Sequence, residues 1–286
     1  MNKRIWLIYG EDEPPQGPYW SKRVSILARR AHDLGVEVSS IGIKQAEQRV
    51  FSKQDLFFYR ITHRSIPRIA LRERIEMLNG GFLFNRCGER LGNKLAFYQF
   101  AQKHNLPIPP TCSDQEWKER GQNVFKGPYL VKKSLSSQGS GIWRVDDPLL
   151  VENYIDKMAD RCVVQQLKIL SPISDIRILM VGDRAVGSMR RVLNDSSSGE
   201  FRANLSLGLS TAKSYTPSSK ILSLARSFMK LSKLDFVGLD FIKTKDGYLF
   251  LESNLSPGLE GISSLDSCIP ERVLEALFER AKNHEQ

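Results

Sequence analysis

The sequence has few of the residues that build thiolate metal sites, disulfide frameworks or histidine-based catalytic centres. Its four cysteines, at positions 87, 112, 162 and 268, are far apart and form no C-x-x-C pair. This spacing argues against a zinc knuckle and a disulfide-rich secreted domain, and it is typical of a reducing compartment. The four histidines do not cluster either, which leaves little support for a histidine metal site or a Ser-His-Asp triad.

Long apolar runs are also missing. No run approaches the roughly 20 residues that a membrane-spanning helix needs. The apolar run 5–9 is too short for the apolar core of a signal peptide, and a first β-strand explains it better. We therefore expect a cytoplasmic protein with no membrane partner. The 286 residues, 41% hydrophobic and 26% charged, are typical of an ordinary globular protein with one large or two to three small domains.

Positive charge is concentrated in the first third of the chain. Lys and Arg outnumber Asp and Glu by 18 to 10 in residues 1–110, but only by 24 to 22 in the rest. The densest part holds Arg60, Arg64, Arg68, Arg72 and Arg74. Such a field attracts polyanions or acidic substrates. No nucleic-acid-binding motif or interleaved aromatic residue accompanies it, which disfavours nucleic acid. A solvated helix face and a surface for an acidic peptide or metabolite remain the alternatives.

The order of expected elements predicts a mixed architecture. In the first ninety residues, strands at 5–9, 36–41 and 55–60 alternate with helices at 21–34 and 68–79, which predicts a small parallel sheet covered by helices. A helix at 93–104 follows, and Pro107, Pro109 and Pro110 end it. We then expect a small α+β lobe with strands at 129–132, 142–145 and 162–167 and a helix at 148–158. The remaining chain should hold several strands, a helix at 218–231 and a terminal helix from residue 270.

The most informative segment is 249–262, with the sequence LFLESNLSPGLEGI. It begins as an apolar strand, then places Glu252 and Asn254 two residues apart and so on one face, and Ser-Pro-Gly ends the strand. Hard oxygen donors at a strand end suit a magnesium ion bound to nucleotide phosphates. The alternative is an edge strand with solvated polar residues.

A second apolar strand, 236–242, contains a carboxylate at Asp240. A buried carboxylate needs a cation or strong hydrogen-bond donors. The Asp-Gly pair at 246–247 predicts a hairpin that brings Asp240 close to Glu252 and Asn254. Metal binding is therefore the favoured interpretation, and a frayed strand end paired with a lysine is its alternative. We expect Asp240→Ala or Glu252→Ala to abolish turnover of the nucleotide while the fold stays intact.

A lysine followed by a Ser/Gly loop forms a second candidate element. Lys132 lies at the end of a predicted strand, and the loop 135–141 contains two glycines that let backbone N–H groups approach phosphate oxygens. It is not a Walker A loop, because no G-K-[ST] opens a helix. A simple hairpin connection is the alternative, but the combination with Lys94, Asp240 and Glu252 favours phosphate binding.

This combination resembles the ATP-grasp superfamily, specifically its RimK-like branch of carboxylate–amine ligases. The resemblance covers nearly the whole chain and is tightest in 238–262, where GLDFI and LESNLSPGLEGI are similar to the branch's signature. The segments 175–177 and 201–205 also match its pattern. The implied fold is an ATP-grasp fold of the α/β and α+β classes. It would have a pre-ATP-grasp parallel α/β domain at 1–92, a small central α+β ATP lobe at 93–168 and a larger C-terminal α+β lobe at 169–286.

The resemblance also implies a role for individual residues. ATP would be contacted through its phosphates by two lysines and the loop, through its adenine by a hinge segment and through its ribose by one carboxylate; these residues are Lys94, Lys132, Ser136, Ser137, Gln138, Gly139, Ser140, Gly141, Gln165, Gln166, Leu167, Lys168 and Asp175. Mg²⁺, or Mn²⁺ in its place, would be held by Asp240, Glu252 and Asn254. The transferred phosphate and the acyl group would face Arg177, Arg191 and Arg202. For each arginine alone, a surface or ion-pair role is the alternative.

Three departures from the branch's pattern lie where a substrate would bind. Gln166 stands where the branch often has an acid. The connection 191–201 is long and Ser-rich, and the segment 205–208 lacks the basic Gly-Gly pattern. We therefore do not transfer a substrate from the family.

The predicted activity is an ATP-dependent ligation of a carboxylate substrate and an amine substrate, through an acyl phosphate, into an amide or peptide bond. A peptide or an amino acid is the expected substrate type, and an acidic peptide would suit the basic first third. One alternative is an enzyme that makes side-chain lactam or ester links on a ribosomal precursor peptide. A non-catalytic nucleotide-binding or nucleic-acid-binding protein is the alternative of another class. The sequence is compatible with a homo-oligomer.

Overall fold

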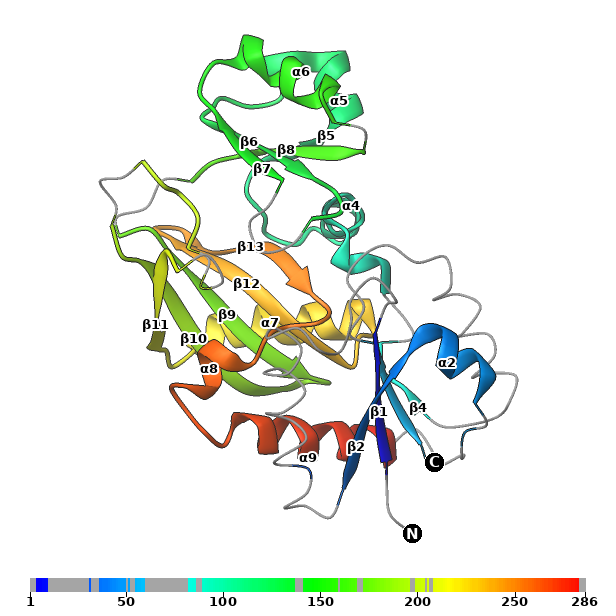
Figure 1. Ribbon diagram of the computed structural model, residues 1–286. Coiled ribbons are helices and arrows are strands. Elements are labelled where there is room, and N and C mark those ends of the chain that lie inside the picture. Colours follow the sequence, from blue (N-terminus) through cyan, green and yellow to red (C-terminus); the bar gives the residue numbers. More distant parts are fainter. Residues whose placement is uncertain are drawn as a thin grey trace.

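Three β-sheets organise the part of the chain that the computed structural model describes (Figure 1). The described residues are 4–9, 31, 36–49, 51, 55–59, 82–85, 89–136, 141–158, 160–168, 172–195, 199–203, 205 and 208–282. None of the helices described is long and apolar enough to cross a membrane.

The N-terminal sheet is parallel and has the strand order β2-β1-β3-β4. Its strands are β1 (Arg4–Tyr9), β2 (Glu37–Gly42), β3 (Leu56–Tyr59) and β4 (Phe82–Leu83), and the short helix α2 (Ile43–Gln48) follows β2. The predicted parallel sheet and its three predicted strands are confirmed. The predicted helices 21–34, apart from residue 31, and 68–79 lie outside the described residues, as does the basic cluster from Arg60 to Arg74.

The central sheet is antiparallel, with the order β5-β8-β6-β7, and belongs to the lobe at the top of Figure 1. Its elements in chain order are β5 (Thr111–Ser113), α5 (Asp114–Arg120), η2 (Gly121–Asn123), β6 (Tyr129–Lys133), β7 (Ile142–Val145), α6 (Pro148–Asp156) and β8 (Cys162–Gln166). The strands predicted at 129–132, 142–145 and 162–167 are confirmed. The strand β5 and the helix α5 were not predicted, although a capping box of Ser113 and Glu116 marks the start of α5.

Strand alternation gives the central sheet two different faces. One face packs on α5 and α6 around Trp117, whose ring centroid lies 5.0 Å from that of Tyr129. Because successive side chains point to opposite faces, Lys132 and Gln165 belong to the other face. The core therefore fixes which side of the lobe carries the candidate phosphate-binding lysine.

The C-terminal sheet has the order β11-β10-β9-β12-β13, and its neighbouring strands are antiparallel. The strands are β9 (Ser174–Val181), β10 (Arg184–Leu193), β11 (Ser210–Ser214), β12 (Phe236–Thr244) and β13 (Gly247–Asn254). Helix α7 (Ser219–Ser232) buries Phe228 against one face of this sheet. The predicted hairpin is confirmed, since β12 and β13 pair and Gly247 adopts a φ of 140° at the turn.

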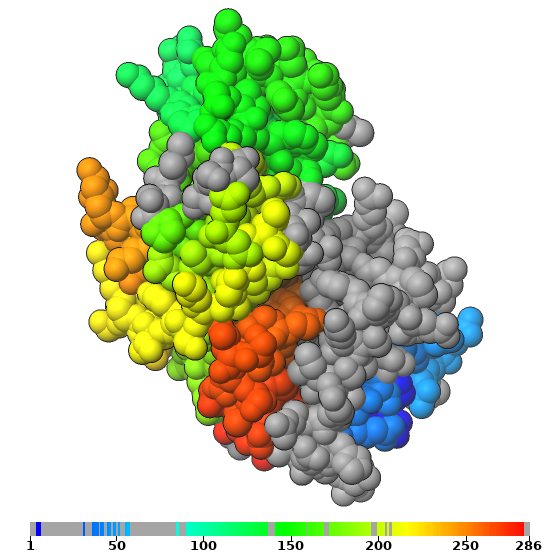
Figure 2. Space-filling view, turned by 60° about the vertical axis from the view of Figure 1, so that its left-hand side comes forward, coloured from blue at the N-terminus to red at the C-terminus, as the bar shows by residue number. Residues whose placement is uncertain are grey.

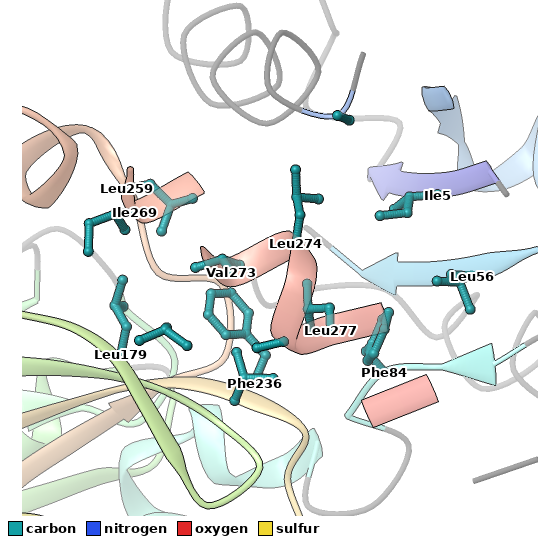
Figure 3. Packing of buried hydrophobic residues seen from close by; sticks show 14 of the residues in the cluster. Ile5, Leu56, Phe84, Leu179, Phe236, Leu259, Ile269, Val273, Leu274 and Leu277 are labelled. Atoms are coloured by element: carbon teal, nitrogen blue, oxygen red, sulfur yellow. The ribbon is translucent and has the colours of Figure 1, made fainter. Parts of the chain in front are cut away.

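The C-terminal helix α9 (Ile269–Lys282) packs between the C-terminal sheet and the N-terminal sheet (Figure 3). Val273, Leu274 and Leu277 lie in one cluster with residues of both sheets, among them Leu56 and Leu179. The short helix α8 (Glu260–Ser263) precedes α9. Figure 2 shows the surface of these C-terminal residues in orange and red, and the green central lobe at the opposite end of the molecule.

The segment between the N-terminal and central sheets contains η1 (Glu89–Gly92) and helix α4 (Lys94–Lys103). The Asn93 side chain caps α4 by accepting hydrogen bonds from the backbone N–H groups of Leu95 and Ala96. This cap fixes Lys94 as the first residue of the helix. Helix α4 contacts both β8 and β13, so Lys94 lies where the central and C-terminal sheets approach each other.

Candidate functional site

Six of the predicted site residues share one face of the C-terminal sheet. Asp240 on β12 pairs directly with Arg177 on β9 and with Glu252 on β13, and Arg191 on β10 pairs with Asp175 on β9. Side chains of directly paired residues, and of residues two apart on a strand, point the same way. The same rule adds Asn254, two residues after Glu252. The strand register therefore brings together charged residues from four strands.

Four of these residues form a buried network of ion pairs. Arg177 donates to both oxygens of Asp240, with Nε–Oδ1 and Nη2–Oδ2 distances of 2.7 Å. Arg191 donates to both oxygens of Asp175, at 2.5 and 2.8 Å, and from Nη2 to Oδ2 of Asp240 at 2.8 Å. Two guanidinium groups thus balance two carboxylates, which is how charges are tolerated away from water.

The two carboxylates of this network have different proton affinities. Burial raises the pKa of Asp175 to about 6, because Arg191 only partly offsets the loss of hydration. Burial also acts on Asp240, but Arg177 and Arg191 together hold its pKa at about 2. Burial acts to lower the pKa of Arg191, but its two neighbouring carboxylates, Asp175 and Asp240, outweigh burial and raise it. At neutral pH the network therefore contains two arginine cations and two ionised carboxylates.

Lys94 and Glu252 face each other at the edge of this network. Lys94 Nζ lies 3.7 Å from Glu252 Oε2, and the Glu252 side chain is 38% exposed. Lys94 also donates to the backbone carbonyl of Ser136 at 2.8 Å and to its hydroxyl at 3.2 Å. The lysine from α4 therefore links the start of the Ser/Gly loop with the predicted metal ligand on β13.

Lys132 is the buried cation on the central sheet. Its Nζ donates to Oε1 of Gln165 at 2.6 Å, and both residues are buried. Burial and the nearby positive charge of Lys94 lower the pKa of Lys132 to about 8, while Glu252 opposes this shift. Lys132, Lys94 and Glu252 thus interact electrostatically although they come from three different elements.

The predicted hinge continues from β8. The side chain of Gln166 donates to the backbone carbonyl of Lys126 at 2.7 Å. The backbone N–H groups of Gln166 and Leu167 donate to the carbonyls of Pro110 and Pro128, at 2.8 Å each. These bonds join the hinge to the central lobe. Lys168 follows them, and the roles of Gln166, Leu167 and Lys168 toward adenine stay predictions.

Arg202 lies on the connection between β10 and β11, where sequence reasoning missed a partner. Its Nε and Nη2 atoms donate to Glu200 at 2.8 and 2.7 Å. Glu200 also accepts from the backbone N–H groups of Phe201 and Arg202, at 2.9 Å each. The bonds from Arg202 outweigh burial and hold the pKa of Glu200 at about 2. An acid two residues before a candidate arginine was the signal available in the sequence.

The described part of the loop consists of its two ends. Gly141 adopts a φ of 66°, and its carbonyl accepts a hydrogen bond from the backbone N–H of Lys133 at 2.8 Å. This bond closes the β6–β7 connection. Residues Ser137, Gln138, Gly139 and Ser140 lie outside the described residues.

The chemistry of the donor set fits a divalent cation that prefers oxygen ligands. Glu252 offers a partly exposed carboxylate, and Asn254 offers an amide oxygen that accepts a hydrogen bond from the backbone N–H of Ser256 at 3.0 Å. A carboxylate has about four lone-pair directions. Asp240 uses three of them on its arginines, so it retains capacity for a further partner. The described residues contain no cluster of three or more His, Cys, Asp or Glu side chains, so Asn254 is needed to complete the predicted set.

The three-sheet arrangement is that of the ATP-grasp fold. The chain superimposes with a TM-score of 0.67 on D-alanine–D-alanine ligase from Bacillus anthracis complexed with ATP, at 12% identity, covering 99% of both chains. It superimposes with a TM-score of 0.66 on the ATP-grasp ligase PsnB complexed with a minimal precursor, Mg and ADP, at 17% identity and 97% coverage of both chains. The predicted fold class is confirmed.

A sequence model of the RimK-like ATP-grasp domain matches residues 93–277. The chain therefore belongs to the RimK-like ATP-grasp family, as its motifs predicted. It is 29% identical over 180 residues to a "Probable alpha-L-glutamate ligase" of Pseudomonas putida, covering 60% of this chain and 58% of that protein. It is 28% identical over 201 residues to a protein of the same name from Legionella pneumophila (Corby), covering 68% and 65%. The chain thus matches less than two thirds of either relative's length.

Proposed function

We propose that this protein is an ATP-dependent carboxylate–amine ligase, with glutamate as the amino acid that it joins to a second substrate. The single observation that carries the proposal is the meeting of Lys94, Lys132 and Glu252 beside the buried network of Arg177 and Arg191. Two cations suit the phosphates of a nucleotide, and the carboxylate would suit a metal ion bound with them. The choice of glutamate as a substrate rests on the names of the relatives.

The proposed chemistry follows from the weakness of a carboxylate as an acyl donor. The carboxylate oxygen attacks the γ-phosphorus of ATP, the bond to the β-phosphate oxygen breaks, and an acyl phosphate and ADP result. The amine then attacks the acyl carbon, loses a proton, and releases phosphate as the amide forms. Atoms and charge balance without a redox partner.

The chain's own residues would bind and stabilise these species. Lys94 and Lys132 would hold the phosphates, and Arg177 and Arg191 lie next to Asp240, where negative charge on the transferred phosphoryl group would develop. Glu252, Asn254 and Asp240 would hold Mg²⁺, which supplies charge neutralisation on the β- and γ-phosphate oxygens when bound. Arg202 would face the acyl group only after exchanging Glu200 for the substrate.

A phosphate-release assay with ATP and Mg²⁺ tests the proposal. Glutamate is offered as the amine with a panel of acids and peptides, and mass spectrometry identifies any product. We expect phosphate release that requires both substrates, and a product heavier by one glutamyl residue. Glu252→Gln should remove it, whereas the exposed α9 residue Glu275 provides the matched control, Glu275→Gln. Phosphate release that never depends on an acid and an amine would contradict the proposal.

The same assay distinguishes the peptide-modifying alternative. PsnB and the macrocyclase MdnC from Microcystis aeruginosa, whose structures were solved with precursor peptides, share the fold at 15–17% identity. An internal link made within one peptide lowers the mass of that peptide by one water. Glutamate ligation instead raises the acceptor's mass, so the two activities give opposite mass changes.

A further inference from the structure

A chain of three hydrogen bonds runs across the central sheet behind Lys132. Lys132 Nζ donates to Gln165 Oε1 at 2.6 Å, and Gln165 Nε2 donates to Thr111 Oγ1 at 2.9 Å. The Thr111 hydroxyl then donates to the backbone carbonyl of Pro109 at 2.7 Å. The three side chains come from β6, β8 and β5, which are neighbours in the sheet.

The sheet register explains why these side chains meet. Thr111 pairs directly with Gln165, and Gln165 lies two residues from Val163, which pairs directly with Lys132. All of them therefore lie on the face opposite Trp117 and the core of the lobe. Lys132 and Gln165 are only 8% and 6% exposed, so bulk water does not replace these partners.

The hydrogen-bonding chemistry allows this chain only one direction. A threonine hydroxyl has one proton, and Thr111 gives it to Pro109, so toward Gln165 the hydroxyl is an acceptor. The amide of Gln165 must then present its NH₂ to Thr111 and its oxygen to Lys132. A lysine ammonium has donors and no acceptor, so the other end of the chain demands the same orientation.

We propose that Gln165 and Thr111 are positioning residues, which hold the Lys132 ammonium at the phosphates of the nucleotide through this one-directional relay. The inference rests on the proposed nucleotide-binding function. It changes the role of Gln165 from a residue lining the adenine to one that acts through Lys132. Lys94, which is held instead by Ser136 and lies 3.7 Å from Glu252, is not part of the relay.

The relay makes a prediction that separates phosphate binding from nucleoside binding. Thr111→Val keeps the shape of the side chain but removes the acceptor that orients Gln165. The Gln165 amide oxygen is then no longer held toward the Lys132 ammonium. We expect ADP affinity to fall about tenfold, which is the scale of one hydrogen bond to a charged group. Adenosine lacks phosphates, so its affinity should change less than twofold. Thr111→Ser retains the hydroxyl and should restore ADP binding.

Isothermal titration of ADP and adenosine, each with Mg²⁺ present, measures both affinities. Thr211→Val is the matched control, because the exposed Thr211 hydroxyl donates to Asn194 on the far connection instead. Gln165→Leu is a second variant with the same expected loss for ADP, and thermal unfolding confirms that each variant is folded.

The outcomes separate the inference from the function on which it rests. A selective loss for ADP with rescue by Thr111→Ser supports the relay. Equal losses for ADP and adenosine, or no loss for either, overturn it while leaving nucleotide binding intact. A wild-type protein that binds no adenine nucleotide overturns the proposed function and the relay together.

Discussion

Asp240 is the residue whose removal should cost the most stability among the proposed metal ligands. Its carboxylate accepts three hydrogen bonds from Arg177 and Arg191 and is 2% exposed. Asp240→Ala leaves Arg177 without the only acceptors recorded for it among the described residues. Removing one partner of a buried ion pair costs about 3–5 kcal/mol, because the remaining charge stays buried.

This cost is large on the scale of the protein. A loss of about 3–5 kcal/mol is about a fifth or more of an ordinary unfolding free energy and lowers the melting temperature by about 10 °C. The sequence motif alone led us to expect an intact fold for this variant, since it gave no sign that Asp240 carries two arginines. Glu252, which is 38% exposed, is therefore the cleaner position for a test of metal binding.

Chemical denaturation monitored by circular dichroism measures the loss, with Asp156→Ala as the control. Asp156 accepts from Lys118 at 2.7 Å, but both side chains are more than half exposed, so its loss should cost less than about 1 kcal/mol. The double variant Arg177→Met, Asp240→Leu removes both charges and should recover at least half of the lost stability. A single variant within about 1 kcal/mol of the wild type, or a double variant no better than the single one, would refute the reasoning.

Three further predictions concern other residues. Lys132→Met should abolish ADP binding, yet it should stabilise the fold at pH 7. Burial lowers the pKa of Lys132 in the folded state to about 8, so the charged ammonium destabilises the native state below pH 8. This penalty, about 3 kcal/mol, should disappear as pH rises toward 10.5, so the gap in unfolding free energy between variant and wild type should close there. Glu252→Gln should lower ATP turnover at least 100-fold with unchanged melting temperature, and turnover within tenfold of wild type would argue against its role at the metal. Asn85→Ala should lower the unfolding free energy by about 2–3 kcal/mol in denaturant titrations. The Asn85 side chain accepts from the backbone N–H groups of Asp235 and Phe236 and donates to the carbonyl of Phe236. A loss of unfolding free energy below about 0.5 kcal/mol would contradict this prediction.

Local patterns in the sequence predicted the elements that carry the candidate site. The apolar runs around Asp240 and Glu252, with Asp-Gly between them, were enough to predict the hairpin and its shared face. The prediction worked because strand alternation and a two-residue turn leave few other registers. The helix predicted at 93–104 corresponds to α4, and the structure shows that Asn93 caps its start.

Long-range pairing was not predictable in the same way. Arg177 and Asp240 are 63 residues apart, and no local signal in either strand indicates that they bond bidentately. The ribose role that the family resemblance implies for Asp175 stays a prediction, and no local signal indicated that its carboxylate accepts from Arg191. These contacts depend on the strand order β10-β9-β12, which the periodicity of single strands does not determine.

The transfer of an oxygen atom from the acid to phosphate tests the central claim most directly. Once the assay has identified a carboxylate substrate, that substrate is labelled with ¹⁸O in its carboxyl group and incubated with ATP, Mg²⁺ and the amine. An acyl phosphate intermediate predicts that the released phosphate carries one ¹⁸O atom, as mass spectrometry detects. Product formation with unlabelled phosphate would contradict the account.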